Sequence, residues 1–193
     1  MMQEFPGTPA WRKEMRSTLI EARQAIPVAA RQQADAHLSE RLDTLLGDVD
    51  GKTISLYWPF RGEPDLRKWA ADCRDRGARL ALPAVVAKAH PLEFRAWQQG
   101  DKLEKGVWNI PVPPQGADVV APDIVLAPVV GLDANNFRLG YGGGFFDRTI
   151  ADLRSKGHRP QVIGVGYTQQ RMDTIHPHEF DIAMDEGVLV DAL

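Results

Sequence analysis

The chain has 193 residues, of which 44% are hydrophobic, enough to build one substantial core. Its formal net charge of −3 argues against a dedicated nucleic-acid-binding protein. One cysteine excludes an intrachain disulfide and a cysteine-based zinc site, and suits a reducing compartment. The longest apolar run, residues 124–132, is too short to span a membrane, and no apolar signal segment is visible at the N-terminus. We therefore expect a cytoplasmic protein with neither a membrane nor a nucleic acid as partner.

Two helices are predicted at the start of the chain. The first ten residues look like a loose tail, within which Thr8 and Pro9 form a typical helix start. Apolar residues follow at helical spacing at Trp11, Met15, Leu19 and Ala22. A second helix is expected from about 28 to 46, with an inward face of Ala34, Leu38, Leu42, Leu45 and Leu46.

The pattern then changes to strands that alternate with helices. Helices are expected at 64–77 and from the glycine-rich segment to about Gly157. Strands are expected at 53–58, 79–83, 92–97, 123–130, 161–167 and 188–190, of which 92–97 alternates as a half-exposed strand does. This alternation predicts an α/β fold with a largely parallel sheet. The richest loop, residues 111–122, joins elements of one sheet, so we expect a single domain over 1–193.

The segment RLGYGGGFFDR, residues 138–148, has four glycines in five positions between a predicted strand and a predicted helix. Neither a Walker A loop nor a G-x-G-x-x-G fingerprint fits these residues. Glycine-rich backbone at a helix N-terminus can direct its N–H groups at an anion, and Arg138 adds a positive charge. Phosphate binding is therefore favoured over a structural turn. Asp147 either complements the helix dipole or holds Mg²⁺ beside the phosphates.

The predicted first helix carries Arg12, Arg16 and Arg23 within about 40° of one another. A solvated basic face is the ordinary interpretation, and a site for a triphosphate is the alternative. Near the end of the chain, HPHEFDIAMDE contains Asp181 and Asp185, which are possible ligands for a hard cation, whereas its two histidines alone give little support for a metal site.

The segment YWPFRGEPD, residues 57–65, follows the first predicted strand at its carboxyl end, where open α/β sheets bind ligands. Trp58 and Phe60 offer flat apolar surfaces there, unless both belong to the core. Glu63 either caps the following helix or accepts hydrogen bonds from paired N–H donors of a ring.

Together these blocks resemble the 5-formyltetrahydrofolate cyclo-ligases, also called 5,10-methenyltetrahydrofolate synthetases. Residues 138–147 are similar to the family signature R-L-G-x-G-x-G-[YF]-[YF]-D, and residues 57–63 to its Y-x-x-x-x-x-E block. The stretches LEFRAW, VWNIPVP and HEFD…D resemble its middle and closing blocks. Several blocks in order, from Trp11 onward, make the resemblance specific.

The resemblance implies a Rossmann-like, three-layer α/β sandwich and an enzyme that needs ATP and Mg²⁺. It implies that ATP phosphorylates the formyl oxygen of 5-formyltetrahydrofolate, that N10 attacks the activated carbon, and that 5,10-methenyltetrahydrofolate, ADP and phosphate are released. ATP and the reduced folate are thus the expected small-molecule partners, Mg²⁺ is the expected cofactor, and a monomer is expected.

Family positions transfer to this sequence residue by residue. Arg138 is the expected catalytic residue, because cations stabilise the charge that develops in phosphoryl transfer. Expected ATP contacts are Arg12, Lys13, Arg16, Arg138, Leu139, Gly140, Tyr141, Gly142, Gly143, Gly144, Phe145 and Phe146. Expected folate contacts are Trp58, Glu63, Tyr141, Gly142, Gly143, Gly144 and Phe145. Expected Mg²⁺ ligands are Asp147 and Asp181, which leaves Asp185 with a structural role.

Some positions depart from the usual family pattern. Phe145 and Phe146 stand where two tyrosines are common, and Arg12 stands where lysine is common. Asn136 replaces a usual glycine, but asparagine tolerates left-handed backbone. The Phe pair supports one alternative, a non-catalytic nucleotide- or folate-binding relative. A sugar-phosphate enzyme on a similar sheet is the other, and it requires an acid/base residue in the site.

Overall fold

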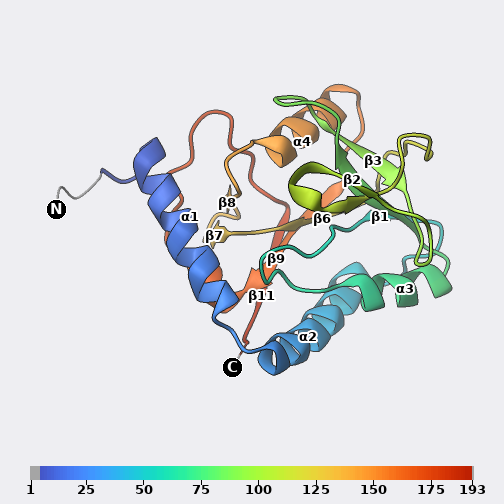
Figure 1. The fold of residues 1–193 in the computed structure, drawn as a ribbon, viewed down its shortest axis with the longest axis horizontal. Coiled ribbons are helices and arrows are strands. Elements are labelled where there is room, and N and C mark those ends of the chain that lie inside the picture. The colour runs from blue at the N-terminus through green and yellow to red at the C-terminus, as the bar shows by residue number, and fades with distance from the viewer. Residues whose placement is uncertain (1–4, 193) are drawn as a thin grey trace.

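The structure is a computed structural model that describes residues 5–192. Its centre is a six-stranded sheet with the strand order β11–β9–β6–β1–β2–β3 (Figure 1). Neighbouring strands pair in parallel, except that β2 and β3 pair antiparallel. The prediction of a largely parallel sheet is confirmed. The strands are β1 (Thr53–Ser55), β2 (Arg79–Val85), β3 (Leu92–Ala96), β6 (Ile124–Pro128), β9 (Gln161–Tyr167) and β11 (Glu186–Val190).

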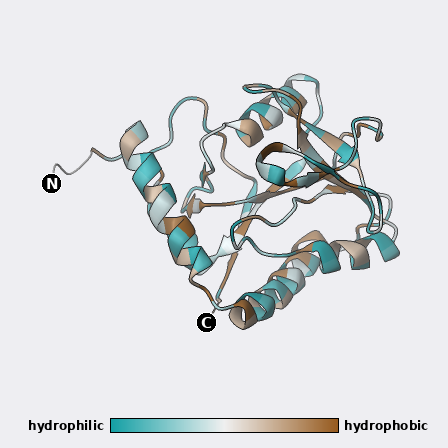
Figure 2. Cartoon of the chain, viewed as in Figure 1, coloured by the Kyte–Doolittle hydropathy of each residue, from teal (hydrophilic) through white to brown (hydrophobic). Residues whose placement is uncertain are grey.

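Helices cover both faces of this sheet. Helices α2 (Val28–Leu46) and α3 (Arg67–Asp75) pack on one face, over the larger cluster of buried apolar residues. Helix α4 (Phe145–Ser155) packs on the other face, where Ile150 belongs to a smaller cluster. In Figure 2 the central strands are mainly apolar and the helices carry polar residues on their outer sides. The predicted three-layer α/β fold is confirmed.

Helix α1 (Pro9–Gln24) lies beside one end of the sheet rather than over a face (Figure 1). It begins as predicted, because the hydroxyl of Thr8 accepts a hydrogen bond from the Trp11 N–H at 3.2 Å. Pro9 and Ala10, the last two of the ten residues expected as a tail, belong to this helix, and residues 1–4 lie outside the described part. The helix packs near a small sheet of β7 (Gly131–Asp133), β8 (Arg138–Leu139) and β10 (Arg171–Met172).

Some side chains differ from the predicted pattern. Ala22 and Leu45 are exposed, because the buried face of α1 runs through Leu19 and Arg23, and that of α2 through Leu42. The strand at 92–97 does not alternate as expected. Arg95 is buried there, since its guanidinium donates to the carbonyl of Pro113 at 3.0 Å.

The segment after β1 leaves the sheet early, so the strand ends at Ser55 rather than at 58. Arg61 and Gly62 have φ values of 48° and 77°, and this left-handed pair turns the chain back toward the sheet. Helix α3 starts at Arg67, later than predicted. A hairpin of β4 (Glu104–Lys105) and β5 (Pro111–Val112) was not predicted. Within residues 5–192, no helix has the length and apolarity needed to cross a membrane.

Candidate active site

A cavity lies at the carboxyl ends of β1, β2 and β6. The ends of parallel strands are the usual ligand-binding edge of an α/β sheet. Helix α1, the β4–β5 hairpin, the glycine-rich segment and the loop before β11 all contribute to its walls. The predicted site residues that line it are Arg12, Arg16, Trp58, Glu63, Arg138, Gly140, Tyr141, Gly142, Gly143, Gly144, Phe145, Phe146, Asp147 and Asp181.

Two predicted ATP contacts do not line this cavity. Lys13 is exposed, because one residue along a helix turns the side chain by about 100° away from Arg12. Leu139 is fully buried and packs with Leu19 and Val130, since neighbouring residues of a strand point to opposite faces.

The glycine-rich segment connects β8 to α4 and lines the cavity with backbone. Gly142 has a φ of 98°, and Gly144, the N-cap of α4, has a φ of 64°. A Cβ on Gly143 would lie 2.6 Å from the ring of Phe145. A side chain is thus disfavoured by conformation at Gly142 and Gly144, and by space at Gly143. The first N–H groups of a helix have no intrahelical acceptor, so this end of α4 can bind an anion.

Three arginines give the cavity a positive half. Arg12 donates to the carboxylate of Asp181 at 2.6 Å, and Arg16 donates to the carbonyl of Gly140 at 2.7 Å. Arg138 is buried, with its guanidinium 4.7 Å from the ring centre of Phe146. Burial lowers the pKa of the Arg138 guanidinium, and burial followed by the charge of Arg12 lowers that of Arg16. Within residues 5–192, the buried Nε atoms of Arg12 and Arg138 have no hydrogen-bond partner.

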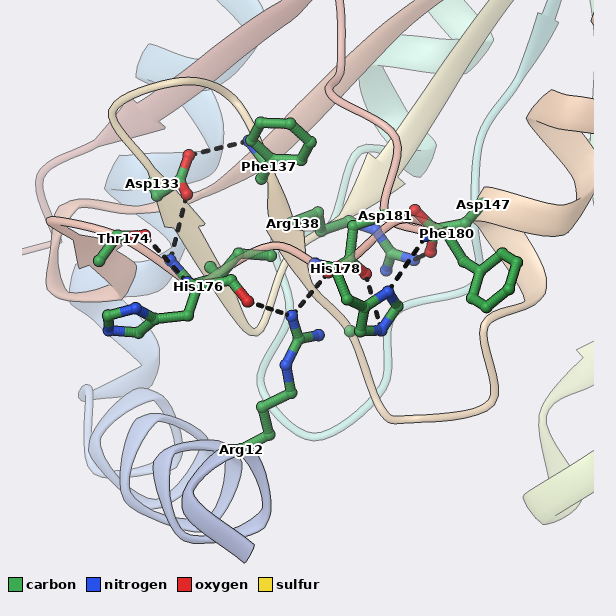
Figure 3. A network of polar contacts seen from close by, with 12 residues as sticks. Arg12, Asp133, Phe137, Arg138, Asp147, Thr174, His176, His178, Phe180 and Asp181 are labelled. Carbon is green, nitrogen blue, oxygen red and sulfur yellow. Dashed lines mark hydrogen bonds and ion pairs between the residues drawn. The ribbon is translucent and has the colours of Figure 1, made fainter. Parts of the chain in front are cut away.

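Two aspartates, Asp147 and Asp181, lie beside Arg138 and Arg12 (Figure 3). Asp147, in the first turn of α4, accepts a hydrogen bond from the Ile182 N–H at 3.0 Å through Oδ1. Its Oδ2 lies 3.8 Å from the guanidinium of Arg138. Asp181 is the residue before Ile182, so this backbone contact brings the two carboxylates to the same wall. Oδ2 of Asp181 also accepts from the His178 N–H at 2.9 Å.

A complete metal site is not preformed among residues 5–192, because no group of three or more His, Cys, Asp or Glu side chains could hold an ion. The ring of His176 packs on Trp11 instead, with 5.2 Å between ring centres. Asp185 accepts a hydrogen bond from the Val162 N–H at 2.8 Å and does not line the cavity, which fits its expected structural role.

Aromatic rings form the other half of the cavity. Phe60, Trp108 and Tyr141 lie with ring centres 5.7–5.9 Å apart, and the first two are nearly parallel. Trp58 lines the same half and carries the guanidinium of Arg67 on its ring at 4.5 Å. Trp108 was missed as a site residue, although it lies within the VWNIPVP block. It is 56% exposed and has a φ of 56°.

Glu63 is the buried acid of this aromatic half. Its Oε1 accepts from the Tyr141 hydroxyl at 2.8 Å, and its Oε2 accepts from the Phe60 N–H at 2.9 Å. Burial raises the pKa of Glu63 to about 7, against the opposing charge of Arg23 and these two hydrogen bonds. Glu63 does not cap α3, whose N-cap is Leu66, so the capping interpretation is wrong.

Comparison with known proteins identifies the family. The family model described as the 5-formyltetrahydrofolate cyclo-ligase family matches residues 8–190. The chain belongs to this family. A 5-formyltetrahydrofolate cyclo-ligase of Mycolicibacterium smegmatis is 29% identical over 92% of each chain. One from Haemophilus influenzae is 24% identical, over 90% of this chain and 94% of that one.

Solved structures of 5,10-methenyltetrahydrofolate synthetases have the same fold. The Mycoplasma pneumoniae structure has a TM-score of 0.72 at 22% identity and covers 91% of this chain and 96% of its own. The Aquifex aeolicus structure has a TM-score of 0.77 at 24% identity and covers 92% of this chain and 89% of its own. The resemblance found in the sequence blocks and the fold expected from it are confirmed.

Proposed function

We propose that this cyclo-ligase family member uses ATP to convert 5-formyltetrahydrofolate to 5,10-methenyltetrahydrofolate, with release of ADP and phosphate. The observation that carries the proposal is the division of one cavity into two chemically different halves. One half has arginines and a glycine-rich helix N-terminus, and the other has aromatic rings around a buried glutamate. A polyphosphate and a flat, hydrogen-bonding ring can therefore be bound side by side.

The positive half fits the phosphates of ATP. The Nε atoms of Arg12 and Arg138, which have no hydrogen-bond partner among residues 5–192, are buried donors that an anion would satisfy. Backbone N–H groups at the start of α4 add donors without adding side chains. Arg16 donates a hydrogen bond to the carbonyl of Gly140 and so links α1 to the glycine-rich segment that would bind the phosphates.

The aromatic half fits the ring system of the reduced folate. Rings from Phe60, Trp108 and Tyr141 offer apolar faces. Both oxygens of Glu63 already accept hydrogen bonds, and an ionised carboxylate has further lone pairs for the N–H donors of a ring edge.

The reaction follows from bringing the two halves together. The formyl oxygen attacks the γ-phosphorus, an O–P bond forms, and the bond from the γ-phosphorus to the β-bridging oxygen breaks to leave ADP. N10 then attacks the formyl carbon, the C–O bond to phosphate breaks, and N10 loses its proton. Positioning and cations supply most of the catalysis in phosphoryl transfer. We assign that stabilisation to Arg138, the buried arginine beside the glycine-rich segment.

The two aspartates fit a Mg²⁺ ion that also binds phosphate oxygens. Mg²⁺ in such sites needs only one or two carboxylates, so the absence of a larger cluster within residues 5–192 is compatible with it. Among those residues, Oδ2 of Asp147 and Oδ1 of Asp181 accept no hydrogen bond. The first lies 3.8 Å from the Arg138 guanidinium and the second lies 3.5 Å from Nε2 of His178. We assign Asp147 and Asp181 as its ligands. The ion would neutralise charge on the phosphates.

We propose that the protein acts as a monomer. We also propose a single domain, which the match of one family model over residues 8–190 supports. A cytoplasmic location is proposed on the sequence grounds given above.

The test is an absorbance assay with purified protein, 5-formyltetrahydrofolate and Mg²⁺, with and without ATP. We expect the near-ultraviolet absorbance of methenyltetrahydrofolate to appear only with ATP, together with ADP. Binding of both ligands without turnover would overturn the proposal in favour of a non-catalytic relative, with the Phe145–Phe146 pair as its cause. Thermal stabilisation by sugar phosphates but not by folate would favour the sugar-phosphate alternative.

A further inference from the structure

Arg23 is a fully buried arginine in the last turn of α1, and it does not line the cavity. The sequence groups it with Arg12 and Arg16, which line the cavity, but Arg23 itself has an exposure of 0%. A buried guanidinium is costly unless its N–H groups are satisfied. A packing role alone does not require a charge here, so the contacts of this charge are informative.

The guanidinium of Arg23 joins three segments that surround the aromatic half. Nε donates to the carbonyl of Arg61 at 2.9 Å, in the left-handed turn before Glu63. Nη1 donates to the carbonyl of Val129 at 3.0 Å, just after β6. Nη2 donates to the hydroxyl of Tyr141 at 2.6 Å, in the glycine-rich segment.

These contacts fix the direction of the neighbouring hydrogen bonds. Arginine only donates, so the Tyr141 oxygen accepts from it and the single hydroxyl proton is directed to Oε1 of Glu63. Oε2 of Glu63 accepts from the Phe60 N–H. Both oxygens of Glu63 are therefore acceptors, the arrangement that suits a carboxylate rather than a carboxylic acid.

We propose that Arg23 is a positioning residue for reduced-folate binding, which acts through Tyr141 to keep Glu63 an ionised acceptor facing the ligand. This inference rests on the proposed function. It gives helix α1 a role in the aromatic half of the cavity, although the other arginines of this helix that line the cavity belong to the positive half.

The charges around Glu63 support this role. Burial opposes ionisation, and Arg23, with Nη2 3.9 Å from Oε1, is the strongest influence that favours it. The Tyr141 hydroxyl, the Phe60 N–H and the more distant Arg138 also favour ionisation. Tyr57 is a further titratable neighbour of Glu63. Its pKa is raised by burial and then by the Glu63 charge, so it stays neutral. Without Arg23, Glu63 would retain its proton to a higher pH.

The experiment measures the affinity for 5-formyltetrahydrofolate in the absence of ATP, by isothermal titration calorimetry between about pH 6 and about pH 9. For the wild type, affinity should weaken as the pH falls through about 7, the pKa of Glu63. In Arg23→Met this midpoint should move up by about one pH unit or more. At neutral pH the variant should bind about tenfold more weakly than the wild type, and this difference in affinity should become smaller at high pH. Arg23→Lys should restore part of the shift, because it restores the charge but not the fork geometry.

Two further variants separate positioning from folding. Tyr141→Phe keeps Arg23 but removes the intermediate hydroxyl, and it should raise the midpoint in the same direction. In a Glu63→Gln background the pH dependence should disappear, and Arg23→Met should then shift no midpoint. Circular dichroism at each pH confirms that the variants compared are folded.

An equal loss of affinity at every pH, with no change in midpoint, would show a structural role only and overturn the inference. Identical behaviour of Arg23→Lys and Arg23→Met would also overturn it, because the charge would then be irrelevant. A wild-type protein that binds no reduced folate at any pH would instead overturn the proposed function. If the wild type binds reduced folate normally and the Arg23 variant shows no shift in the pH midpoint, the inference about Arg23 would be overturned and the proposed function would stand.

Discussion

Replacing Glu63 by glutamine should change how the stability of the protein depends on pH. The Glu63 side chain is 3% exposed, so screening by solvent is small. Burial raises its pKa from 4.5 to about 7. In the folded protein the carboxyl therefore holds its proton more tightly than in the unfolded chain. Between these two pKa values the folded state binds more protons, and the free energy of unfolding falls as the pH rises.

The size of the effect follows from the shift. At about 1.4 kcal/mol per pH unit, ionised Glu63 lowers the free energy of unfolding by about 3 kcal/mol at high pH and by almost nothing below its unfolded pKa. Most of that loss, about 2 to 3 kcal/mol, should occur between pH 5 and pH 8. Glutamine cannot ionise, so the Glu63→Gln variant lacks this part of the pH dependence.

Urea unfolding followed by tryptophan fluorescence, at about pH 5 and about pH 8, measures the effect. The difference between the two pH values is compared, because at any single pH the amide also alters the hydrogen bond from the Phe60 N–H. Glu40→Gln, at an exposed position of α2, is the matched control and should parallel the wild type. If Glu63→Gln also parallels the wild type, the reasoning about a buried, ionising carboxyl is refuted.

The remaining predictions concern the positive half of the cavity. Arg12→Ala should weaken ATP binding about tenfold or more in calorimetry. The control Lys13→Ala, at an exposed position that does not line the cavity, should change the affinity by less than about twofold. Equal effects of the two variants would contradict the placement of these side chains. Asp147→Asn should lower turnover at least about tenfold and raise the Mg²⁺ concentration needed for half-maximal rate, and an unchanged Mg²⁺ dependence would remove it from the metal site. Gly142→Ala should lower the free energy of unfolding by about 1 to 2 kcal/mol, because Gly142 has a φ of 98°. The control Gly116→Ala, where a Cβ would meet open space, should not lower it in this way. Equal free energies of unfolding for the two variants would rule out strain at Gly142.

Features that depend on neighbouring residues could be predicted from the sequence. The hydroxyl of Thr8 caps α1 as its type and position indicate, and β9 has the predicted bounds because its apolar run is bordered by clear breaks. Asn136 does adopt the left-handed backbone expected of it, with a φ of 63°. The glycine-rich segment leads into a helix, as its composition and place in the chain suggested.

Features that depend on distant partners could not be predicted. In the sequence Arg23 looks like a surface residue, whereas its burial depends on acceptors 38, 106 and 118 positions away. The sequence leaves two interpretations of Glu63 open, because its partner Tyr141 lies 78 positions away. The hairpin that carries Trp108 has two very short strands, and short strands leave little periodicity in a sequence.

The pairing of Arg12 has a consequence for how the protein is made. Its two partners, the carbonyl of His176 and the carboxylate of Asp181, lie 164 and 169 positions further along the chain. During synthesis α1 emerges long before either partner exists, so Arg12 lacks both of these contacts until those residues follow. Contacts of such long range form late, after a large loop has closed. A nascent chain stopped before residue 176 would therefore carry Arg12 without either of these two partners, and this wall of the cavity would be incomplete.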